Sequence, residues 1–102
     1  MNSLLVTCEH AGHAVPAGVD LGLSDEVLRS QASWDHGALD VANAVAARFG
    51  REVFAGEFSR LFVDLNRPSD HPDVIPEWCY GAHVPTNATL SAQARRQRLD
   101  AV

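Results

Sequence analysis

The chain has 102 residues, of which 46% are hydrophobic and 21% are charged, and its formal net charge is −5. This length corresponds to one small domain at most, and the hydrophobic content is typical of a folded rather than a disordered chain. The acidic balance argues against a nucleic-acid-binding protein, and no apolar run reaches the roughly 20 residues that a membrane-spanning helix needs.

The amino terminus and the two cysteines indicate the cellular compartment. Met1, Asn2 and Ser3 provide no basic region ahead of the first apolar run, so we expect no signal peptide. Cys8 and Cys79 show no spacing pattern, and we interpret them as reduced thiols of a cytoplasmic protein. Cys8 ends an apolar run and is expected to be a small core residue rather than a nucleophile.

The first predicted element is a buried strand that leads into a polar loop. Its apolar run begins at Leu4 and ends in the letters CEH at residues 8–10, and Gly12 and Pro16 then break the chain. In open α/β sheets ligands bind beyond the carboxyl ends of the strands. The polar side chains of this loop are therefore placed where chemistry is expected.

Two helices are predicted next. Ser24 is a suitable N-cap for a short helix over residues 25–30. A longer helix is predicted over residues 38–49, with Gly50 just after its end. Its apolar stripe consists of Ala38, Val41, Ala42, Val45, Ala46 and Phe49. The small alanines favour close packing of this helix on a sheet.

Two further strands are predicted over residues 51–55 and 60–65. The order strand, helix, strand favours a parallel pair with a right-handed crossover. We therefore expect the α/β fold class, with a mainly parallel sheet and flanking helices.

The rest of the chain is predicted to be a long loop and a final helix. Residues 66–87 are rich in proline, and we expect an ordered loop packed by apolar anchors. These anchors are Val74, Ile75, Trp78, Tyr80 and Val84. Ser91 can cap a helix that runs to Val102 without a stop signal, with Arg95, Arg96 and Arg98 facing solvent.

The order of the polar motifs resembles the N-formylglutamate amidohydrolase family. The matching segments read TCEHAGHAVP, WDHGALDVA, FSRLFVDLNRPSD and VIPE followed by GAHVPTNATL. The resemblance implies an α/β fold of the zinc-dependent exopeptidase type, a three-layer sandwich that is incomplete in this chain. Family members are longer, so residues 1–102 are expected to be a single partial domain. The third metal ligand and an acidic catalytic residue are then expected beyond Val102.

A catalytic zinc ion needs three protein ligands and an open position for water. His10 after the first strand and Asp35 at a helix start are the best pair of ligands. Arg60 and Arg67 are expected to bind the carboxylates of an acidic substrate, since a guanidinium matches a carboxylate in a bidentate way. Asp64 and Asn66 are expected to orient these arginines or to bind the substrate.

Each of these roles has a purely structural alternative. His10 can be a hydrogen-bonded loop residue, and Asp35 can simply cap the following helix. Glu9 is either a ligand or a residue that orients His10. Arg60 and Asp64 can form a structural ion pair.

The remaining polar residues are interpreted more simply. His13 is expected to be solvated in its loop, and His36, His71 and His83 are expected at the surface. Glu77 is either a residue of a substrate-binding loop or a solvated carboxylate.

The predicted function is zinc-dependent hydrolysis of the amide bond of N-formylglutamate, or of a similar small acidic N-acyl amino acid, to formate and glutamate in histidine degradation. One alternative is a related metallo-amidase with another acyl amino acid as substrate. The other is a non-catalytic fragment or a module that binds a metal or an anion. No nucleic acid or membrane is expected as a partner, and an uncovered sheet edge predicts self-association.

Overall fold

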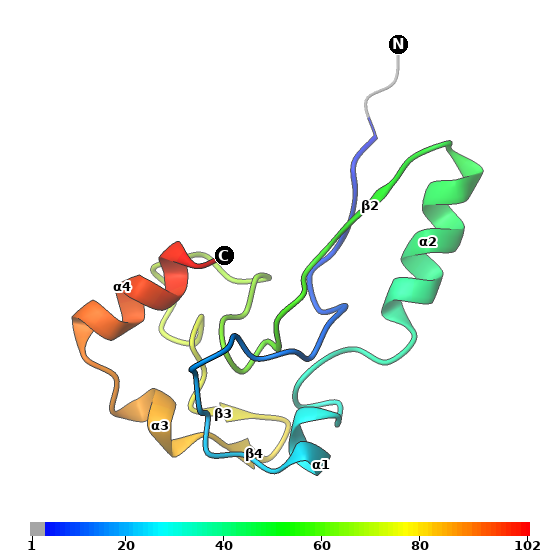
Figure 1. Cartoon of the computed structure of the whole chain (residues 1–102). Coiled ribbons are helices and arrows are strands. Elements are labelled where there is room, and N and C mark those ends of the chain that lie inside the picture. Colours follow the sequence, from blue (N-terminus) through cyan, green and yellow to red (C-terminus); the bar gives the residue numbers. More distant parts are fainter. Residues whose placement is uncertain (1–3) are drawn as a thin grey trace.

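A computed structural model of the chain describes residues 4–102, and residues 1–3, on which part of the signal-peptide expectation rests, lie outside this range. The described chain is a mixed α/β structure (Figure 1). Its elements are β1 (Val6–Cys8), α1 (Asp25–Leu28), α2 (Ala38–Arg48), β2 (Val53–Ala55), β3 (Trp78–Cys79), β4 (Ala82–His83), α3 (Pro85–Ala88) and α4 (Ala92–Asp100). No helix among the described residues is long and apolar enough to cross a membrane.

β1 and β2 form a two-stranded parallel sheet, as the strand–helix–strand order predicts. Val6 lies opposite Val53 in this pair, and α2 runs alongside both strands (Figure 1). The helix begins after Gly37 (φ 80°) and ends shortly before Gly50 (φ 63°). Glycine adopts such left-handed positions at little cost, so these two residues limit the helix. The predicted span of α2 is confirmed to within one residue.

One face of this parallel sheet is exposed, so the expected burial of the first strand holds for its other face only. Cys8, on the side of α2, is only 6% exposed, and Ala46 of the helix is buried. Leu5 and Phe54 are 67% and 65% exposed. Side chains alternate along a strand, so these two residues lie on the face away from α2.

The prediction of a third strand over residues 60–65 is wrong. The segment is a series of turns that begins at Ser59. The backbone N–H of Phe62 donates to the Ser59 carbonyl oxygen at 3.0 Å, and the N–H of Leu61 donates to Ser59 Oγ at 3.0 Å. These N–H groups are satisfied by a local turn, so they do not take part in a ladder of strand hydrogen bonds.

The hydrophobic core lies around these turns rather than on the parallel sheet. It consists of Leu21, Leu61, Phe62, Val63, Val74, Ile75 and Val84. Three of the predicted loop anchors, at positions 74, 75 and 84, are therefore confirmed as buried. Trp78 and Tyr80 are exposed instead. They belong to an antiparallel hairpin of β3 and β4, which the sequence reading took as irregular loop.

The final helix, α4, begins where it was predicted to begin, but not all of its arginines face solvent. Ser91 is its N-cap, and Ser91 Oγ accepts a hydrogen bond from the N–H of Ala94 at 3.1 Å. Arg98 was expected to face solvent and is buried instead. Its Nη1 donates to Asn87 Oδ1 at 2.6 Å and to the Phe62 carbonyl oxygen at 3.3 Å. The buried amide and carbonyl oxygens below α4 explain why a cation points inward.

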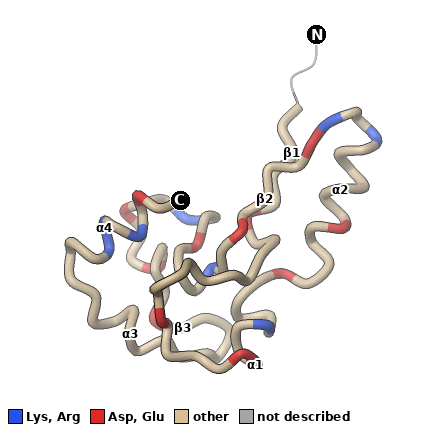
Figure 2. Tube along the Cα trace, in the orientation of Figure 1, with Lys and Arg blue, Asp and Glu red and all other residues tan. Residues whose placement is uncertain are grey.

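The described elements form two parts. Figure 1 shows a strand–helix arm, made of β1, β2 and α2, that extends from a body with α1, α3, α4, the hairpin and the core. The molecule is accordingly elongated, with extents of 47 × 28 × 23 Å. Acidic and basic residues occur along both parts (Figure 2). Both strands of the arm run toward the body, so their carboxyl ends lie at the junction between the two parts. Since this parallel sheet has two strands, the three-layer sandwich stays a prediction.

Candidate active site

The loops that follow β1 and β2 are pressed together at the junction between arm and body. The N–H of Gly56 donates to the Cys8 carbonyl oxygen at 2.9 Å. A Cβ atom on Gly12 would collide with the Glu57 carbonyl, and one on Gly56 would collide with the Glu9 carbonyl. Two glycines therefore permit the backbone approach that fixes the start of the polar loop.

Backbone hydrogen bonds connect three distant segments at this point. The N–H of Asp35 donates to the His10 carbonyl oxygen at 2.9 Å, and the N–H of Arg60 donates to the Ser33 carbonyl oxygen at 3.0 Å. Ser33 is buried, and its Oγ lies 2.6 Å from that of Ser59. The side chains of residues 10, 35 and 60 thus start from a rigid frame.

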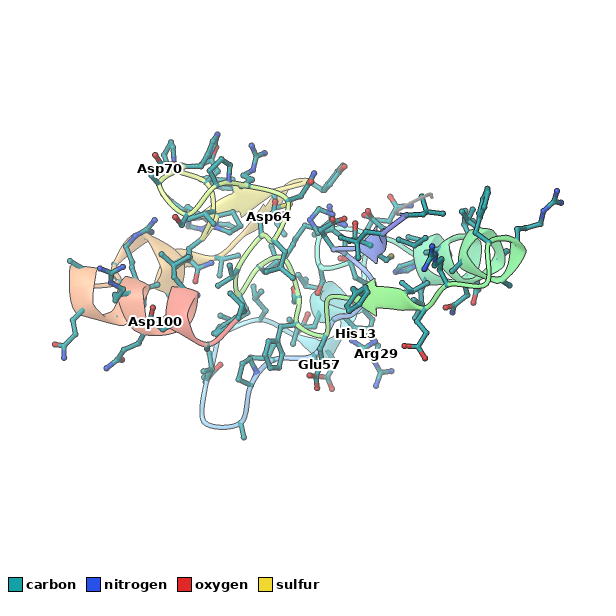
Figure 3. The ribbon with its side chains drawn as sticks, turned by 90° about the horizontal axis from the view of Figure 1, so that it is seen from above. His13, Arg29, Glu57, Asp64, Asp70 and Asp100 are labelled. Carbon is teal, nitrogen blue, oxygen red and sulfur yellow. The ribbon has the colours of Figure 1, made fainter. Side chains whose placement is uncertain are left out.

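Their side chains form a connected cluster of charges. Nδ1 of His10 lies 3.3 Å from Oδ2 of Asp35, and Nε2 of the same ring lies 2.5 Å from Oδ1 of Asp64. Arg60 donates from Nη2 to Oδ1 of Asp35. Arg67 Nε lies 3.5 Å from Oδ2 of Asp64, which lies near the middle of the molecule in Figure 3. The imidazole of His10 is therefore held between two carboxylates, each of which also faces an arginine.

The arginine beside Asp35 decides the ionisation of that carboxyl group. Desolvation by burial tends to raise the pKa of Asp35, but the hydrogen bond and charge of Arg60, together with His10, outweigh it and lower the pKa. Arg60 itself is 5% exposed, and its Nε has no hydrogen-bond partner. Its guanidinium carbon lies 5.4 Å from the centre of the Tyr80 ring. A buried cation with an unused donor is suited to bind an anion.

The neighbouring titratable groups take no visible part in this cluster. The hydroxyl of Thr7 donates to Glu9 at 2.7 Å, and this hydrogen bond lowers the pKa of Glu9. Burial raises the pKa of both Cys8 and Cys79, which are free thiols. Protonated, buried thiols are poor nucleophiles, and the interpretation of Cys8 as a small core residue agrees with this.

Two cavities open on either side of His10. One of about 540 Å³ lies between β1 and α2 and is also lined by Asp35 and Asn66. The other, of about 440 Å³, lies between the cluster and the β3–β4 hairpin. It is lined by His10, Arg60, Asp64, Asn66, Arg67, Trp78, Cys79 and Tyr80. Volumes of this size are typical of small-molecule sites.

Comparisons with known proteins identify the family of the chain. The family model of N-formylglutamate amidohydrolase matches residues 2–102. The chain belongs to the N-formylglutamate amidohydrolase family. A gene product from Agrobacterium tumefaciens with a known crystal structure is 39% identical and superposes with a TM-score of 0.87. The match covers 96% of the present chain and 39% of that protein. A search of curated proteins found no match.

The six residues singled out from the sequence do come together in this family member. His10 and Asp35 are neighbours, as predicted, and Arg60, Asp64 and Arg67 surround them. The N–H of Asn66 donates to Asp64 Oδ1 at 3.0 Å, so the sixth residue is present too. The alternative of an ion pair between Arg60 and Asp64 is wrong, because each pairs with a different partner.

Three other polar predictions have mixed outcomes. His36 and His83 are exposed, as expected, whereas His13 and His71 are half-buried. The ring of His13 lies against Trp34, with 4.9 Å between the ring centres. Glu77 accepts from His83 at 2.8 Å beside the hairpin. Sequence reasoning also missed that the hairpin lines the second cavity, although Gly81 is itself a turn signal.

The His10–Asp35 pair fits two of the positions that a zinc ion needs. Two ligand atoms of a tetrahedral zinc ion with bonds of about 2.0–2.1 Å lie about 3.3–3.4 Å apart. Nδ1 of His10 and Oδ2 of Asp35 are separated by 3.3 Å. Asp64 faces the other ring nitrogen, as an orienting carboxylate does in metal sites. Within residues 4–102 no group of three or more His, Cys, Asp or Glu side chains is arranged to hold a metal.

Proposed function

We propose that this chain carries part of the active site of a cytoplasmic zinc-dependent hydrolase. Its reaction is cleavage of the amide bond of N-formylglutamate, or of a similar small acidic N-acyl amino acid, as in histidine degradation. The observation that supports the proposal best is the position of His10, with one ring nitrogen facing Asp35 and the other facing Asp64. The family assignment provides the reaction class.

In this proposal His10 and Asp35 hold the zinc ion, and a third ligand comes from outside residues 4–102. A bound zinc ion lowers the pKa of its water to about 7 and polarises the amide carbonyl. Asp64 holds the imidazole in its orientation by a hydrogen bond to Nε2. The chain's own contribution is a fixed ligand pair on a rigid backbone frame.

The substrate side of the proposal rests on the two arginines. Arg60 and Arg67 both line the second cavity, and Nε of Arg60 is buried without a hydrogen-bond partner. Guanidinium groups bind carboxylates with strong, charge-assisted hydrogen bonds. Asn66 fixes the Asp64 carboxylate between them. An anionic substrate would then be held next to the ligand pair.

The metal proposal is tested by zinc titration of the chain against a chelating dye. We expect His10→Ala and Asp35→Ala each to weaken zinc binding more than about tenfold, and Asp64→Asn to weaken it about 10–100-fold. Asp40→Ala, at an exposed carboxylate in the first turn of α2, is the matched control and should bind as the parent chain does. Equal zinc binding by all four variants would contradict the proposal.

A second candidate is a module that binds a metal or an anion without hydrolysis. The observation that favours it is that residues 4–102 supply two candidate zinc ligands rather than a set of three. Formate release from N-formylglutamate separates the two candidates. Zinc-dependent release supports the hydrolase, and zinc binding without release supports the module.

A further inference from the structure

The β3–β4 hairpin has a tyrosine at a turn position that favours small residues. The strands are joined by Tyr80 and Gly81 alone, with φ angles of 47° and 80°. A two-residue turn with positive φ at both positions strongly prefers Asn-Gly. In the described part of the chain Tyr80 is the one residue other than glycine with a positive φ, where bulky side chains are uncommon. Turn chemistry therefore does not account for the tyrosine, and its ring must be explained by what it contacts.

The ring of Tyr80 lies over the guanidinium of Arg60. The guanidinium carbon is 5.4 Å from the ring centre, which is within the range of a cation–π interaction. Tyr80 is 75% exposed, whereas Arg60 is 5% exposed. An exposed tyrosine of the hairpin thus contacts a buried cation of the charged cluster.

The guanidinium of Arg60 has few other restraints. Within residues 4–102 its side chain donates one hydrogen bond, from Nη2 to Oδ1 of Asp35, and its Nε is buried without a partner. Two parallel hydrogen bonds to a carboxylate fix the plane of a guanidinium, but a single one leaves it free to rotate. The face of an aromatic ring restricts this rotation, because the planar guanidinium stacks on it.

The orientation of Arg60 matters because of the carboxylate that it contacts. Arg60 takes Oδ1 of Asp35, and the other oxygen, Oδ2, lies 3.3 Å from Nδ1 of His10. The side chain of Asp35 is 48% exposed, so it has room to adopt other rotamers when its partners do not hold it. Arg60 therefore determines which oxygen of Asp35 remains beside the imidazole.

We propose that Tyr80 is a positioning residue of the site. Its ring holds the Arg60 guanidinium on Oδ1 of Asp35, so that Oδ2 stays next to Nδ1 of His10 and the ligand pair is ready for zinc. This inference rests on the hydrolase function proposed above, to which it adds a residue from the hairpin. Tyr80 acts through Arg60 and is not itself a metal ligand.

The inference is tested by zinc titration of the full chain against a chelating dye. Tyr80→Asn removes the ring and places the preferred asparagine before Gly81, so the variant should melt at the temperature of the parent chain or above it. We expect its zinc affinity to fall about threefold to tenfold, because Arg60 no longer holds Asp35 in one orientation. Tyr80→Phe keeps the ring and should restore the affinity of the parent chain. An unchanged affinity in Tyr80→Asn, or an equal loss in both variants, would overturn the inference.

A double-mutant cycle shows whether the tyrosine acts through Arg60. Arg60→Met removes the guanidinium and keeps an unbranched side chain. In this background Tyr80→Asn should change the zinc affinity by less than about twofold, because the ring has lost the group that it orients. The same fall in both backgrounds would contradict the inference. A fall in zinc affinity that accompanies a lower melting temperature of Tyr80→Asn would indicate a structural role of the ring and would contradict it too.

Phe49→Ala provides the matched control. Phe49 is a 63% exposed aromatic residue at the end of α2 and lies outside the lining of the second cavity. Its removal should leave the zinc affinity unchanged, and a loss equal to that of Tyr80→Asn would refute a specific role of Tyr80. His10→Ala reports on the hydrolase proposal separately. If zinc binding falls in His10→Ala but not in Tyr80→Asn, the role of Tyr80 alone is refuted, and if it falls in neither variant, both proposals are refuted.

Discussion

At the scale of single residues, the sequence indicated which side chains form the site. It did not indicate which of them pair with one another. His10 follows the first predicted strand and Asp35 precedes a predicted helix, but it was the resemblance to the family that singled them out as ligands. The pairing of Arg60 with Asp35 depends on the turns after Ser59, which the pattern of apolar residues does not encode. Sequence reasoning therefore identified the members of the cluster and missed the way they are connected.

The close backbone contact at Gly12 leads to a prediction about stability. In Gly12→Ala the added methyl group would collide with the Glu57 carbonyl, and the backbone around His10 would have to shift. We expect a loss of about 1–3 kcal/mol in the free energy of unfolding, as is usual for an overpacked site. Urea denaturation measures this loss.

The control for this prediction is Ala17→Ser, at an exposed loop position of the same region. It should change stability by less than about 0.5 kcal/mol. A Gly12→Ala chain as stable as the control would show that the two loops separate without cost.

At the scale of elements, capping residues and glycines predicted the limits of the helices reliably. Apolar runs did not predict the strands reliably. Ser24 and Ser91 cap their helices as predicted, because a hydroxyl near free N–H groups acts locally. Residues 60–65 were interpreted as a strand because the segment contains the apolar run Leu61, Phe62 and Val63. These three residues are buried in the core instead, and the hydroxyl of Ser59 closes a turn. Whether an apolar segment finds a strand partner is a tertiary property.

The burial of Arg98 in α4 leads to a second prediction. Arg98→Ala leaves Asn87 Oδ1 and the Phe62 carbonyl oxygen without their donor below the helix. Loss of one partner of a buried hydrogen bond costs about 1–3 kcal/mol, so we expect the free energy of unfolding to fall by this amount. Thermal and urea melts followed by circular dichroism provide the measurement.

Arg96→Ala is the matched control on the same helix, because Arg96 is exposed. Its effect should stay within about 0.5 kcal/mol. If the two variants lose the same stability, the loss reflects helix charge rather than the buried contact.

At the scale of the whole molecule, the arm and the body meet at the charged cluster. The overall α/β class and the parallel pairing of β1 and β2 were predicted, since they follow from element order. The elongated shape was not predicted, because nothing local in the sequence states that the core forms in the body and leaves one face of the sheet exposed.

The ionisation of Asp35 leads to a prediction about pH. Its pKa is lowered in the folded chain, so the folded state binds this proton less readily than the unfolded state. The carboxylate therefore stabilises the fold above the unfolded pKa of about 4, and this contribution is lost as the pH falls through the lower folded pKa. We expect the urea midpoint to fall between about pH 5 and pH 3.

Asp35→Asn should flatten this part of the pH profile, because the titrating group is gone. Asp100→Asn, at an exposed carboxylate at the end of α4, should keep the profile of the parent chain. An unchanged profile in Asp35→Asn would assign the acid sensitivity to other carboxyl groups.

The position of His10 between Asp35 and Asp64 has a mechanical consequence. The first carboxylate lies just before α2 and the second lies in the turns of the body, so one imidazole bridges the two parts of the molecule. Loss of the His10 ring would therefore remove two side-chain contacts between these parts at once.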